Sequence, residues 1–532
     1  MHTRLLQFMT VVSFLLILFS CNLSDIPKTD DGFIGTSGQR FVDSQGREVI
    51  LHGINVVNKD PQTKYVGHVN AEDFTKFKSW GFNVVRLGII WDGLEPEPGV
   101  YNEEYLKNID QMIQWATDNG IYVFLDMHQD LFSVQFSDGA PRWATITDSL
   151  PHLTGEIWSD AYLMSPAVQT AFDHFWNNSP SPDGTGIQDH YITLWKMIAA
   201  RYSQNSTVIG YDIMNEPFMG SEANNVMPLL LEGYAKMLVE KTGQTSPPAE
   251  ELMMMWVSPT ERLKVLETLS KRDVYQKVID AIYDVNAAFE SRVLTPFFQK
   301  ARDVIREVDQ KHIIFIEHSY FTNMGVTGAL QPLVNSDGSR DSLVAYAAHG
   351  YDLVVDTDAI ALGSNDRVAL IFDRIAESGK RMNMPVLIGE WGAFGTKTPE
   401  VVPTAEFLMN EFNRNNFSDS YWAYGSHMDG AAYVDVLQKT YPVKTAGYLT
   451  GYNYNSTDGI FECTWEENKN IGGQTIIYVP DLYRIAIEEL KVEPKAKDIR
   501  MEKIDNSNAG YLRIPTSGKN EIRKLTFQLS KN

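Results

Sequence analysis

The sequence predicts a (β/α)₈ barrel followed by a small β-sandwich. From residue 48 to residue 427, eight short apolar runs alternate with segments of helical periodicity. Continuous apolar strands between helices are typical of a parallel sheet covered on both faces. Eight such units favour a closed barrel, although the pattern alone also allows a doubly wound open sheet. After residue 428 the helical periodicity gives way to short alternating runs separated by turn residues, which is typical of a β-sandwich.

The first half of the barrel is predicted from four strands and the helices between them. The strands are expected at 48–57, 82–90, 121–128 and 208–214, and the helices at 70–81, 102–120 and 190–202. Asn70 marks a helix start, because its side chain can cap the first free N–H groups. Gly81 and Gly120 mark helix ends, because glycine tolerates the left-handed backbone that follows a C-terminus.

The second half repeats the pattern after an interruption. Strands are expected at 312–319, 343–351, 384–392 and 420–426, and helices at 294–310, 369–383 and 404–416. Residues 219–293, after the fourth strand, form a long Met- and Leu-rich helical insertion. Two interpretations stay open for it. It is either a helical subdomain packed on the barrel or an apolar lid beside the site, because methionine surfaces adapt to flexible partners such as a lipid.

Composition and the N-terminal segment bound the function. The chain has 532 residues and 43% hydrophobic content, which suffices for a large domain and a smaller one. A net charge of −22 argues against nucleic-acid binding, which needs a basic surface. Arg4 precedes an apolar run that ends at Cys21, as in a secretory signal, and "LFSC" also resembles a bacterial lipoprotein box. We therefore expect a secreted or extracytoplasmic protein, either free or lipid-anchored through Cys21.

These observations divide the chain into four parts. The expected parts are a signal at 1–21, a tether at 22–32, a catalytic barrel at 33–427 that contains the insertion, and a β-sandwich at 428–532. The chain has two cysteines, Cys21 and Cys463, and a disulfide between a signal-region cysteine and a late one is not expected. No later stretch is apolar over the ~20 residues that a membrane-spanning helix needs.

Polar residues at the predicted strand ends are the candidates for chemistry. In a (β/α)₈ barrel the catalytic groups lie at the C-terminal ends of the strands. The residues at or just after these ends are Asn55, Lys59, Arg86, Asp126, His128, Asp130, Asn215, Glu216, His349, Tyr351, Glu390 and Trp422. Pro217 stops the fourth strand directly after Glu216, so this strand displays its polar end rather than burying it.

Glu216 and Glu390 form the pair of carboxyl groups that glycoside hydrolysis requires. One group stays protonated and donates to the leaving oxygen, while the other is ionised and attacks the anomeric carbon. In a retaining enzyme the two stand about 5–5.5 Å apart. Arg86 could keep Glu390 ionised, because a nearby positive charge favours a carboxylate. Taken singly, each of these residues could equally be structural.

The ordered set of residues resembles glycoside hydrolase family 5. That family carries an Arg on strand two, a His after strand three, Asn-Glu-Pro at strand four, His-x-Tyr at strand six, a Glu at strand seven and a Trp at strand eight. The motifs "HGINVVNK" (52–59), "DMHQDLFS" (126–133), "GYDIMNEPF" (210–218) and "GEWG" (389–392) are similar to its endoglycoceramidase branch, which includes β-glucosylceramidases. The resemblance implies that Glu216 is the acid/base, that Glu390 is the nucleophile and that no cofactor is needed.

The same resemblance implies roles for the remaining residues. Those expected to hold the sugar next to the scissile bond are Lys59, His128, Asp130, Asn215 and Trp422. Those expected to support the two glutamates are Arg86, His349 and Tyr351, with Tyr351 bonding the nucleophile. The implied substrate is a glycosphingolipid, a ganglioside or a neutral glycosylceramide, reached at a membrane surface and cleaved into intact oligosaccharide and ceramide.

Other functions are compatible with parts of the pattern. A β-glucosylceramidase would accept only monoglycosylceramide, and a family 5 β-glucanase or mannanase would accept a polysaccharide. A carbohydrate-binding surface lipoprotein without activity has no need for an acid/base pair such as Glu216 and Glu390. His128 with Asp126 and Asp130 could bind a cation, but sugar binding accounts for the same residues, and we expect no metal.

Overall fold

Eight parallel strands close into a barrel in the computed structural model, which describes residues 32–355, 357, 359–395, 399–456 and 458–530. Around the barrel the order is β4 to β11, with β11 pairing back onto β4. Their bounds are β4 His52–Val56, β5 Val84–Ile90, β6 Tyr122–His128, β7 Val208–Asp212, β8 Ile313–Ile316, β9 Val344–His349, β10 Val386–Glu390 and β11 Ser418–Tyr421. The predicted (β/α)₈ barrel is confirmed, and the open-sheet alternative is wrong.

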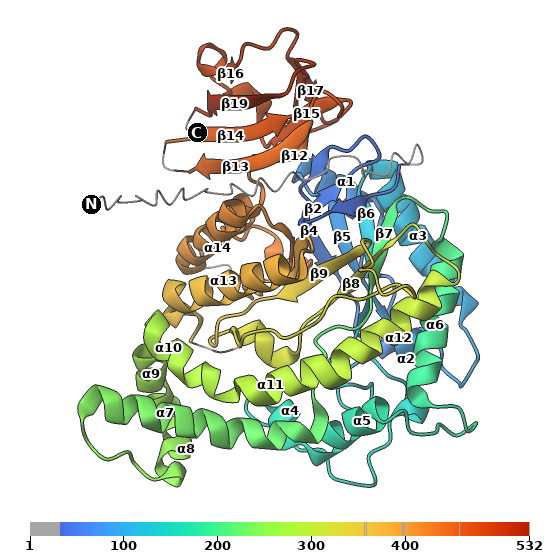
Figure 1. Ribbon diagram of the computed structural model, residues 1–532, viewed down its shortest axis with the longest axis vertical. Coiled ribbons are helices and arrows are strands. Elements are labelled where there is room, and N and C mark those ends of the chain that lie inside the picture. The colour runs from blue at the N-terminus through green and yellow to red at the C-terminus, as the bar shows by residue number, and fades with distance from the viewer. Residues whose placement is uncertain (1–31, 356, 358, 396–398, 457, 531–532) are drawn as a thin grey trace, which may run out of the picture.

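The helices that follow the strands surround the barrel, as Figure 1 shows. Their bounds are α1 Ala71–Ser79, α3 Glu103–Asn119, α6 Ile187–Tyr202, α12 Thr295–Arg306, α13 Asn365–Met382 and α14 Val402–Asn415. Asn70 caps α1 by accepting a hydrogen bond from the Glu72 N–H, and the Asp73 side chain accepts from the Asn70 N–H in return. Gly120 ends α3 with a φ of 67°, the left-handed conformation that glycine adopts without strain.

The insertion after β7 is helical, as predicted. It contains α7 Val226–Thr242, α8 Ala249–Val257, α9 Pro259–Thr268, α10 Arg272–Ile279 and α11 Tyr283–Phe289. These helices lie together at the lower end of the molecule in Figure 1. Helix α10 packs against α7 on one side and against α13 of the barrel on the other, so the insertion extends the wall of the barrel beyond the C-terminal ends of its strands.

The first predicted strand, 48–57, is divided in the structure. Its start forms β3 (Glu48–Val49), which pairs with β2 (Arg40–Val42) and with β12 (Tyr441–Thr445), while its end forms β4 of the barrel. The N-terminal strands, with β1 (Gly35–Ser37), thus belong to a sheet of the C-terminal part of the chain. Hydrophobic periodicity did not reveal this division, because both pieces are buried and the run between them is continuous.

Two antiparallel sheets form the C-terminal β-sandwich, as predicted. One sheet has the order β1-β2-β3-β12-β15-β18-β17 and the other β13-β14-β19-β16. The further bounds are β13 Gly447–Asn455, β14 Ile460–Glu467, β15 Gln474–Val479, β16 Lys491–Glu493, β17 Arg500–Lys503, β18 Gly510–Pro515 and β19 Glu521–Gln528. Trp465, Tyr478 and Phe527 lie in the apolar core between them, as does the free thiol of Cys463. Within the described residues, every helix is too short or too polar to cross a membrane.

Candidate active site

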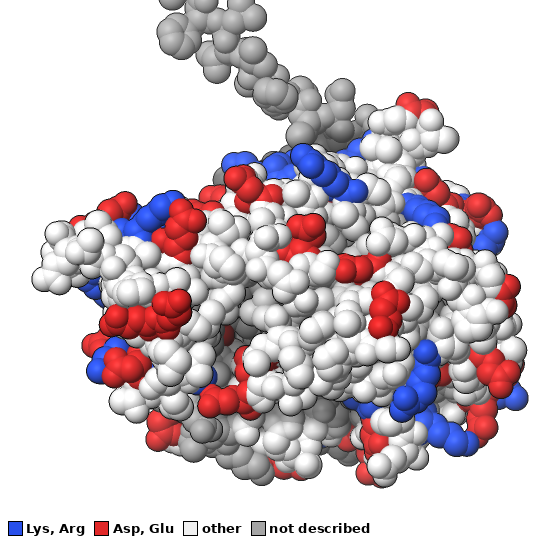
Figure 2. Space-filling model, turned by 90° about the horizontal axis from the view of Figure 1, so that it is seen from below, with Lys and Arg blue, Asp and Glu red and all other residues white. Residues whose placement is uncertain are grey.

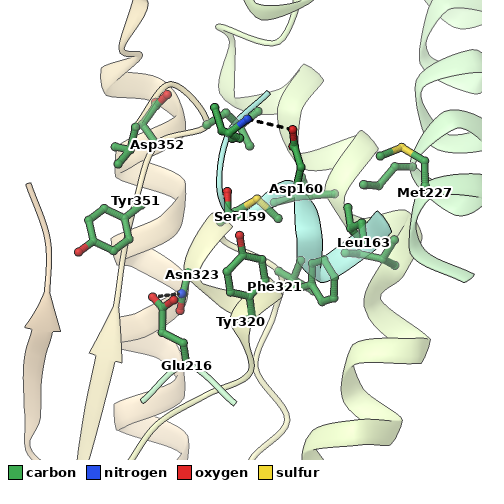
Figure 3. Close-up of a pocket in the computed structure, with 18 of the residues that line it drawn as sticks. Ser159, Asp160, Leu163, Glu216, Met227, Tyr320, Phe321, Asn323, Tyr351 and Asp352 are labelled. Atoms are coloured by element: carbon green, nitrogen blue, oxygen red, sulfur yellow. Dashed lines mark hydrogen bonds between the residues drawn. The ribbon is translucent and has the colours of Figure 1, made fainter. Parts of the chain in front are cut away.

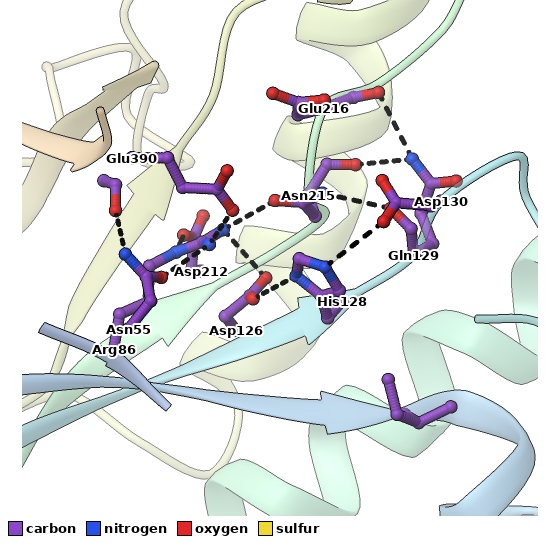
Figure 4. A network of polar contacts seen from close by, with 12 residues as sticks. Asn55, Arg86, Asp126, His128, Gln129, Asp130, Asp212, Asn215, Glu216 and Glu390 are labelled. Atoms are coloured by element: carbon purple, nitrogen blue, oxygen red, sulfur yellow. Dashed lines mark hydrogen bonds and ion pairs between the residues drawn. The ribbon is translucent and has the colours of Figure 1, made fainter. Parts of the chain in front are cut away.

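Arg86 on β5 lies at the centre of the polar mouth of the barrel and is fully buried. Its guanidinium nitrogens lie 2.7 Å from Glu390 Oε1, 2.7 Å from Glu317 Oε1 and 2.9 Å from both Asp126 Oδ1 and Asp212 Oδ2. Burial alone would lower the pKa of Arg86, but these four carboxyl groups raise it well above its usual value. Because the planar guanidinium can serve several carboxylates at once, it fixes the ends of five strands relative to one another (Figure 4).

Glu390 ends β10 and is almost completely buried. Arg86 donates to its Oε1 at 2.7 Å, and the Tyr351 hydroxyl donates to its Oε2 at 2.9 Å. The Asn55 amide donates to the backbone carbonyl of Gly389 at 2.8 Å, which links the end of this strand to β4 across the end of β11. Each oxygen of the buried Glu390 carboxyl group therefore has a hydrogen-bond donor.

Glu216 lies in the turn after β7 in a strained conformation. Its φ is 40°, in the left-handed region, which costs a non-glycine residue on the order of 1–3 kcal/mol. Its N–H donates to Glu317 Oε2 at 2.8 Å, and the Gln129 amide donates to the Glu216 carbonyl at 3.3 Å. Its Oε1 accepts from Asn323 Nδ2 at 2.6 Å and contacts His349 Nδ1 at 3.0 Å. These contacts hold the strained turn and direct the carboxyl group into the mouth.

The environment of Glu216 suits a proton donor. Burial raises its pKa to about 7, the nearby charge of Glu390 acts in the same direction, and the contact with His349 acts against both. A carboxylate oxygen of Glu216 and one of Glu390 lie within 4.8 Å of each other. This separation fits the closely spaced pair of a retaining glycosidase and leaves too little room for the water of an inverting one.

His349, at the end of β9, lies between the carboxyl groups. Its Nδ1 is 3.0 Å from Glu216 and 3.7 Å from Glu390, and its Nε2 is 3.3 Å from Glu317. Burial would lower the pKa of His349, but the charges of Glu317 and Glu390 outweigh it and raise this pKa well above its usual value. The imidazole is therefore a second buried cation beside Arg86, and it offsets part of the negative charge.

A second polar group forms the wall across from Glu390. The Lys59 ammonium pairs with Asp130 and lies 4.6 Å from the centre of the Trp422 ring. Trp422 stacks on the His128 ring, with ring centres 5.1 Å apart and an interplanar angle of 15°. Burial would raise the pKa of Asp130, but Lys59 and His128 lower it to about 2. Such charged groups can bind the hydroxyls of a sugar, and the neighbouring aromatic face can pack against its ring.

Asn215, directly before Glu216, is held in place by two hydrogen bonds. Its Oδ1 accepts from Arg86 at 3.0 Å, and its Nδ2 donates to the backbone carbonyl of Gln129 at 3.0 Å. These two contacts fix the orientation of the amide at the strand end.

All the strand-end residues singled out in the sequence come together at this mouth. Four further residues, Gln129, Asp212, Glu317 and Asn323, were not predicted. Glu317 directly follows β8 and satisfies the strand-end criterion that identified the others, so the signal was present in "FIEHS". Asn323 lies in a 3₁₀ turn, Tyr320–Met324, whose sequence has no periodicity that points to a site.

Three clusters of histidine and acidic side chains bring possible metal-ligand atoms within 4.8 Å of one another in the described part of the chain. Each cluster faces or contains a cation of the protein itself. Lys59 lies beside Asp130 and Asp138, Arg86 lies among Asp126 and its neighbours, and His349 is a member of the third. The carboxylates therefore have positive partners without a metal ion.

One cavity of about 510 Å³ connects the carboxyl groups to the helical insertion. At one end it is lined by Glu216, Glu390 and the polar wall. The apolar end is lined by Met227, Leu230, Leu231, Leu252, Trp256, Val265, Leu269, Val278, Ile279, Phe321 and Met324. In Figure 3, Glu216 and Tyr351 lie on one side, Leu163 and Met227 on the other, and Tyr320 lies between them. The insertion therefore packs on the barrel, as the first interpretation has it, and it also contributes apolar side chains to the cavity beside the site.

Comparisons with known proteins agree with this architecture. A family model described as "Cellulase (glycosyl hydrolase family 5)" matches residues 42–428, and one described as "Glycoside hydrolase family 5 C-terminal domain" matches residues 439–526. An endoglycoceramidase of Cyanea nozakii is 35% identical over 230 residues, which cover 37% of this chain and 44% of the relative. One of Hydra vulgaris is 32% identical over 255 residues, which cover 42% and 48%.

The same comparison can be made with solved structures. Endo-glycoceramidase II from Rhodococcus sp., in a complex with a five-membered iminocyclitol, is 25% identical and superposes with a TM-score of 0.69. The match covers 92% of this chain and 99% of the other. In sequence, by contrast, the aligned segments span less than half the length of the two relatives from Cyanea nozakii and Hydra vulgaris.

Proposed function

We propose that this chain, which belongs to glycoside hydrolase family 5, cleaves the β-glycosidic bond between the glycan and the ceramide of a glycosphingolipid. It retains the configuration of the sugar and releases an intact oligosaccharide and ceramide. The observation that carries the proposal is the single cavity that joins two buried glutamates to an apolar chamber. A glycosphingolipid has the same division, because a polar glycan is joined through one glycosidic bond to two hydrocarbon chains.

The first chemical step forms a glycosyl-enzyme. Glu390, held by Arg86 and Tyr351, attacks the anomeric carbon, and the bond to the glycosidic oxygen breaks. Glu216 gives its proton to that oxygen, which leaves as the primary hydroxyl of ceramide. A pKa of about 7 supports this role, because Glu216 is then protonated in a large fraction of the protein molecules at neutral pH.

The second step returns the enzyme to its starting state. Glu216, now ionised, accepts a proton from water, and the resulting hydroxide attacks the anomeric carbon while the ester to Glu390 breaks. The oligosaccharide leaves with its original configuration, and the proton that water lost remains on Glu216. In this proposal Lys59, His128, Asp130, Asn215 and Trp422 hold the sugar next to the scissile bond through both steps.

The apolar end of the cavity supports a lipid as the leaving group. A polysaccharide hydrolase would need a polar, aromatic-lined cleft on both sides of the scissile bond to hold further sugars. Here the insertion contributes mainly methionine, leucine, isoleucine and valine side chains to the leaving-group side, together with the aromatic rings of Tyr234, Trp256 and Tyr275. The relatives named endoglycoceramidase favour the same substrate class.

Export and membrane access form part of the proposal and rest on the sequence. The apolar run that ends at Cys21 lies outside the described residues and supports an extracytoplasmic protein, secreted or lipid-anchored. A glycosphingolipid resides in a bilayer, so we propose that the enzyme meets its substrate at a membrane surface.

Product analysis tests the proposed reaction. The protein without residues 1–23 is incubated with a ganglioside, with lactosylceramide and with glucosylceramide, and the products are identified by mass. Intact oligosaccharide together with ceramide is the expected result. Release of glucose from glucosylceramide alone would indicate a β-glucosylceramidase. Hydrolysis of soluble glucan or mannan, with no reaction on the three lipids, would exclude the proposed substrate.

A further inference from the structure

Exposed apolar side chains surround the outer end of the cavity. Trp158 lines the cavity and is nevertheless 43% exposed, so the cavity reaches the surface at this residue. Leu153 and Met164, from the same stretch of chain, are 45% and 50% exposed. An ion pair of 2.7 Å between Glu156 and Arg262 ties this stretch to helix α9 of the insertion. The opening is therefore bordered by two segments that are far apart in the sequence.

Helix α8, at the same end, is apolar on both faces. Leu252 and Trp256, four residues apart, line the cavity. Met254 and Val257 point the other way and are 61% and 51% exposed. A helix on the surface of a soluble domain normally has a polar outer face. The acidic residues of α8 are confined to its first turn, so the outer face of its remaining part is apolar.

We propose that this rim, defined as Leu153, Trp158, Met164, Met254 and Val257, inserts into the surface of an uncharged or zwitterionic lipid bilayer. The cavity then opens directly into the layer that holds the substrate, and a glycolipid passes into it without crossing water. The inference rests on the proposed function and adds the surface through which that substrate enters.

The position of the rim favours lipid over a protein partner. Whatever covers the rim must leave the opening beside Trp158 free, because this opening leads to the catalytic glutamates. A folded protein docked there would close the passage, whereas a fluid bilayer lets single lipids move into it. Methionine and tryptophan side chains also suit a bilayer interface. Methionine is flexible, and tryptophan is enriched at the level of the lipid headgroups.

The charges around the rim favour neutral lipids. Helix α9 carries two cations, Arg262 and Lys264, and they pair with Glu156 and Glu261. The chain as a whole has a net charge of −22. Attraction to anionic lipids depends on clusters of unpaired basic residues near the surface. In Figure 2, which views the molecule from below, this end shows broad uncharged areas around a hollow, with acidic and basic groups in scattered clusters between them.

Vesicle binding tests the rim. The protein without residues 1–23 is mixed with phosphatidylcholine vesicles, with and without lactosylceramide, and the bound fraction is measured by flotation. Met254→Glu/Val257→Glu should bind about tenfold more weakly or worse, because charged side chains at these positions resist insertion. Its hydrolysis of lactosylceramide in vesicles should fall by a similar factor, while hydrolysis of a soluble aryl β-lactoside should remain unchanged. Ile522→Glu, at a 65% exposed position of strand β19 in the β-sandwich, is the matched control and should bind as the unchanged protein does.

Several outcomes would overturn the docking. Unchanged vesicle binding in the double variant would do so, and so would an equal loss in Ile522→Glu. If the double variant also loses activity on the soluble substrate, Leu153→Glu decides the question, because this residue lies on the other segment and does not line the cavity. A dimer that dissociates in the double variant while vesicle binding persists would assign the rim to a second copy. Rim-dependent vesicle binding without ceramide release would support the docking and exclude the proposed substrate.

Discussion

The two ends of the cavity are built in opposite ways. At the catalytic end, buried charges are packed closely and each has a partner of opposite sign, with Arg86 and His349 among carboxyl groups from several strands. At the other end, helices of the insertion contribute apolar side chains, and helix α8 is apolar even on its exposed face. At the catalytic end the exact positions of the side chains matter, because charged hydrogen bonds are directional. At the apolar end the strength of binding depends on the buried area and on the fit of the surfaces. We therefore expect catalysis and the proposed recognition of lipid to be separable by substitutions at the two ends.

The largest effect is expected from Glu390→Gln. An amide cannot form the glycosyl ester, so activity should fall at least about 10⁴-fold on lactosylceramide and on a soluble aryl lactoside alike. Initial rates on both substrates measure this. Glu307→Gln, which changes an exposed glutamate in a surface ion pair with Lys196, is the matched control and should leave both rates unchanged. A loss confined to the lipid substrate would contradict the role of Glu390.

Glu216→Gln should separate leaving groups. Without a proton donor, cleavage of lactosylceramide should slow about 10²- to 10⁴-fold, because ceramide leaves as a poor alkoxide. Formation of the glycosyl-enzyme from a dinitrophenyl lactoside should slow far less, since that leaving group needs no proton. Burst kinetics with both substrates measure the difference. Equal slowing of this step on both substrates would show that Glu216 positions the sugar rather than donating a proton.

At the apolar end, Trp256→Ala should affect lipid substrates alone. Loss of one large apolar contact with ceramide should lower kcat/KM for lactosylceramide about 10- to 100-fold. The aryl lactoside lacks hydrocarbon chains, so its kcat/KM should stay the same. Trp80→Ala removes an indole at the end of α1, at the opposite end of the barrel from the mouth, and serves as the control. A parallel loss on both substrates would break the separation of the two ends.

The catalytic end was largely predictable from sequence because strand order determines it. Once eight strands are placed in a barrel, the residues that follow them must meet at one mouth, as Arg86, Glu216 and Glu390 do. Glu317 satisfies the same rule and was overlooked, although it holds both Arg86 and the Glu216 N–H. Asn323 could not be found this way, because it lies in a short 3₁₀ turn between β8 and β9 that has no periodicity.

The apolar end was predictable only as a pair of alternatives. Composition indicated a Met- and Leu-rich helical insertion, but a helix rich in apolar residues can line a cavity or fill a core. Only the packing of α10 between α7 and α13 decides which side chains face inward. The division of the first strand between β3 and β4 was missed for a similar reason, since its partner β12 lies almost 400 residues later in the chain.

The smallest effect concerns the pH dependence at the catalytic end. Burial raises the pKa of Glu216 to about 7. Because the proton donor must be protonated, kcat/KM should fall as the pH rises through about 7. Asn323 donates to Glu216 Oε1 at 2.6 Å, and this bond favours the ionised form. In Asn323→Ala this hydrogen bond is lost, so the pKa of Glu216 should rise. The alkaline limb of the pH profile of kcat/KM should then shift to higher pH by about one unit or less.

The control and the choice of substrate make this small shift decisive. Asn108→Ala, on the exposed face of α3, should keep the limb at about 7. A downward shift in Asn323→Ala would mean that the amide favours the protonated carboxyl group, contrary to the geometry. Since kcat/KM reports the free enzyme, lactosylceramide and an aryl lactoside with a poor leaving group should give the same limb. The pH profile of kcat, by contrast, reports the enzyme–substrate complex. Alkaline limbs of kcat that differ between the two substrates would mean that lipid bound in the apolar chamber changes the electrostatics of Glu216, so that the two ends of the cavity are coupled.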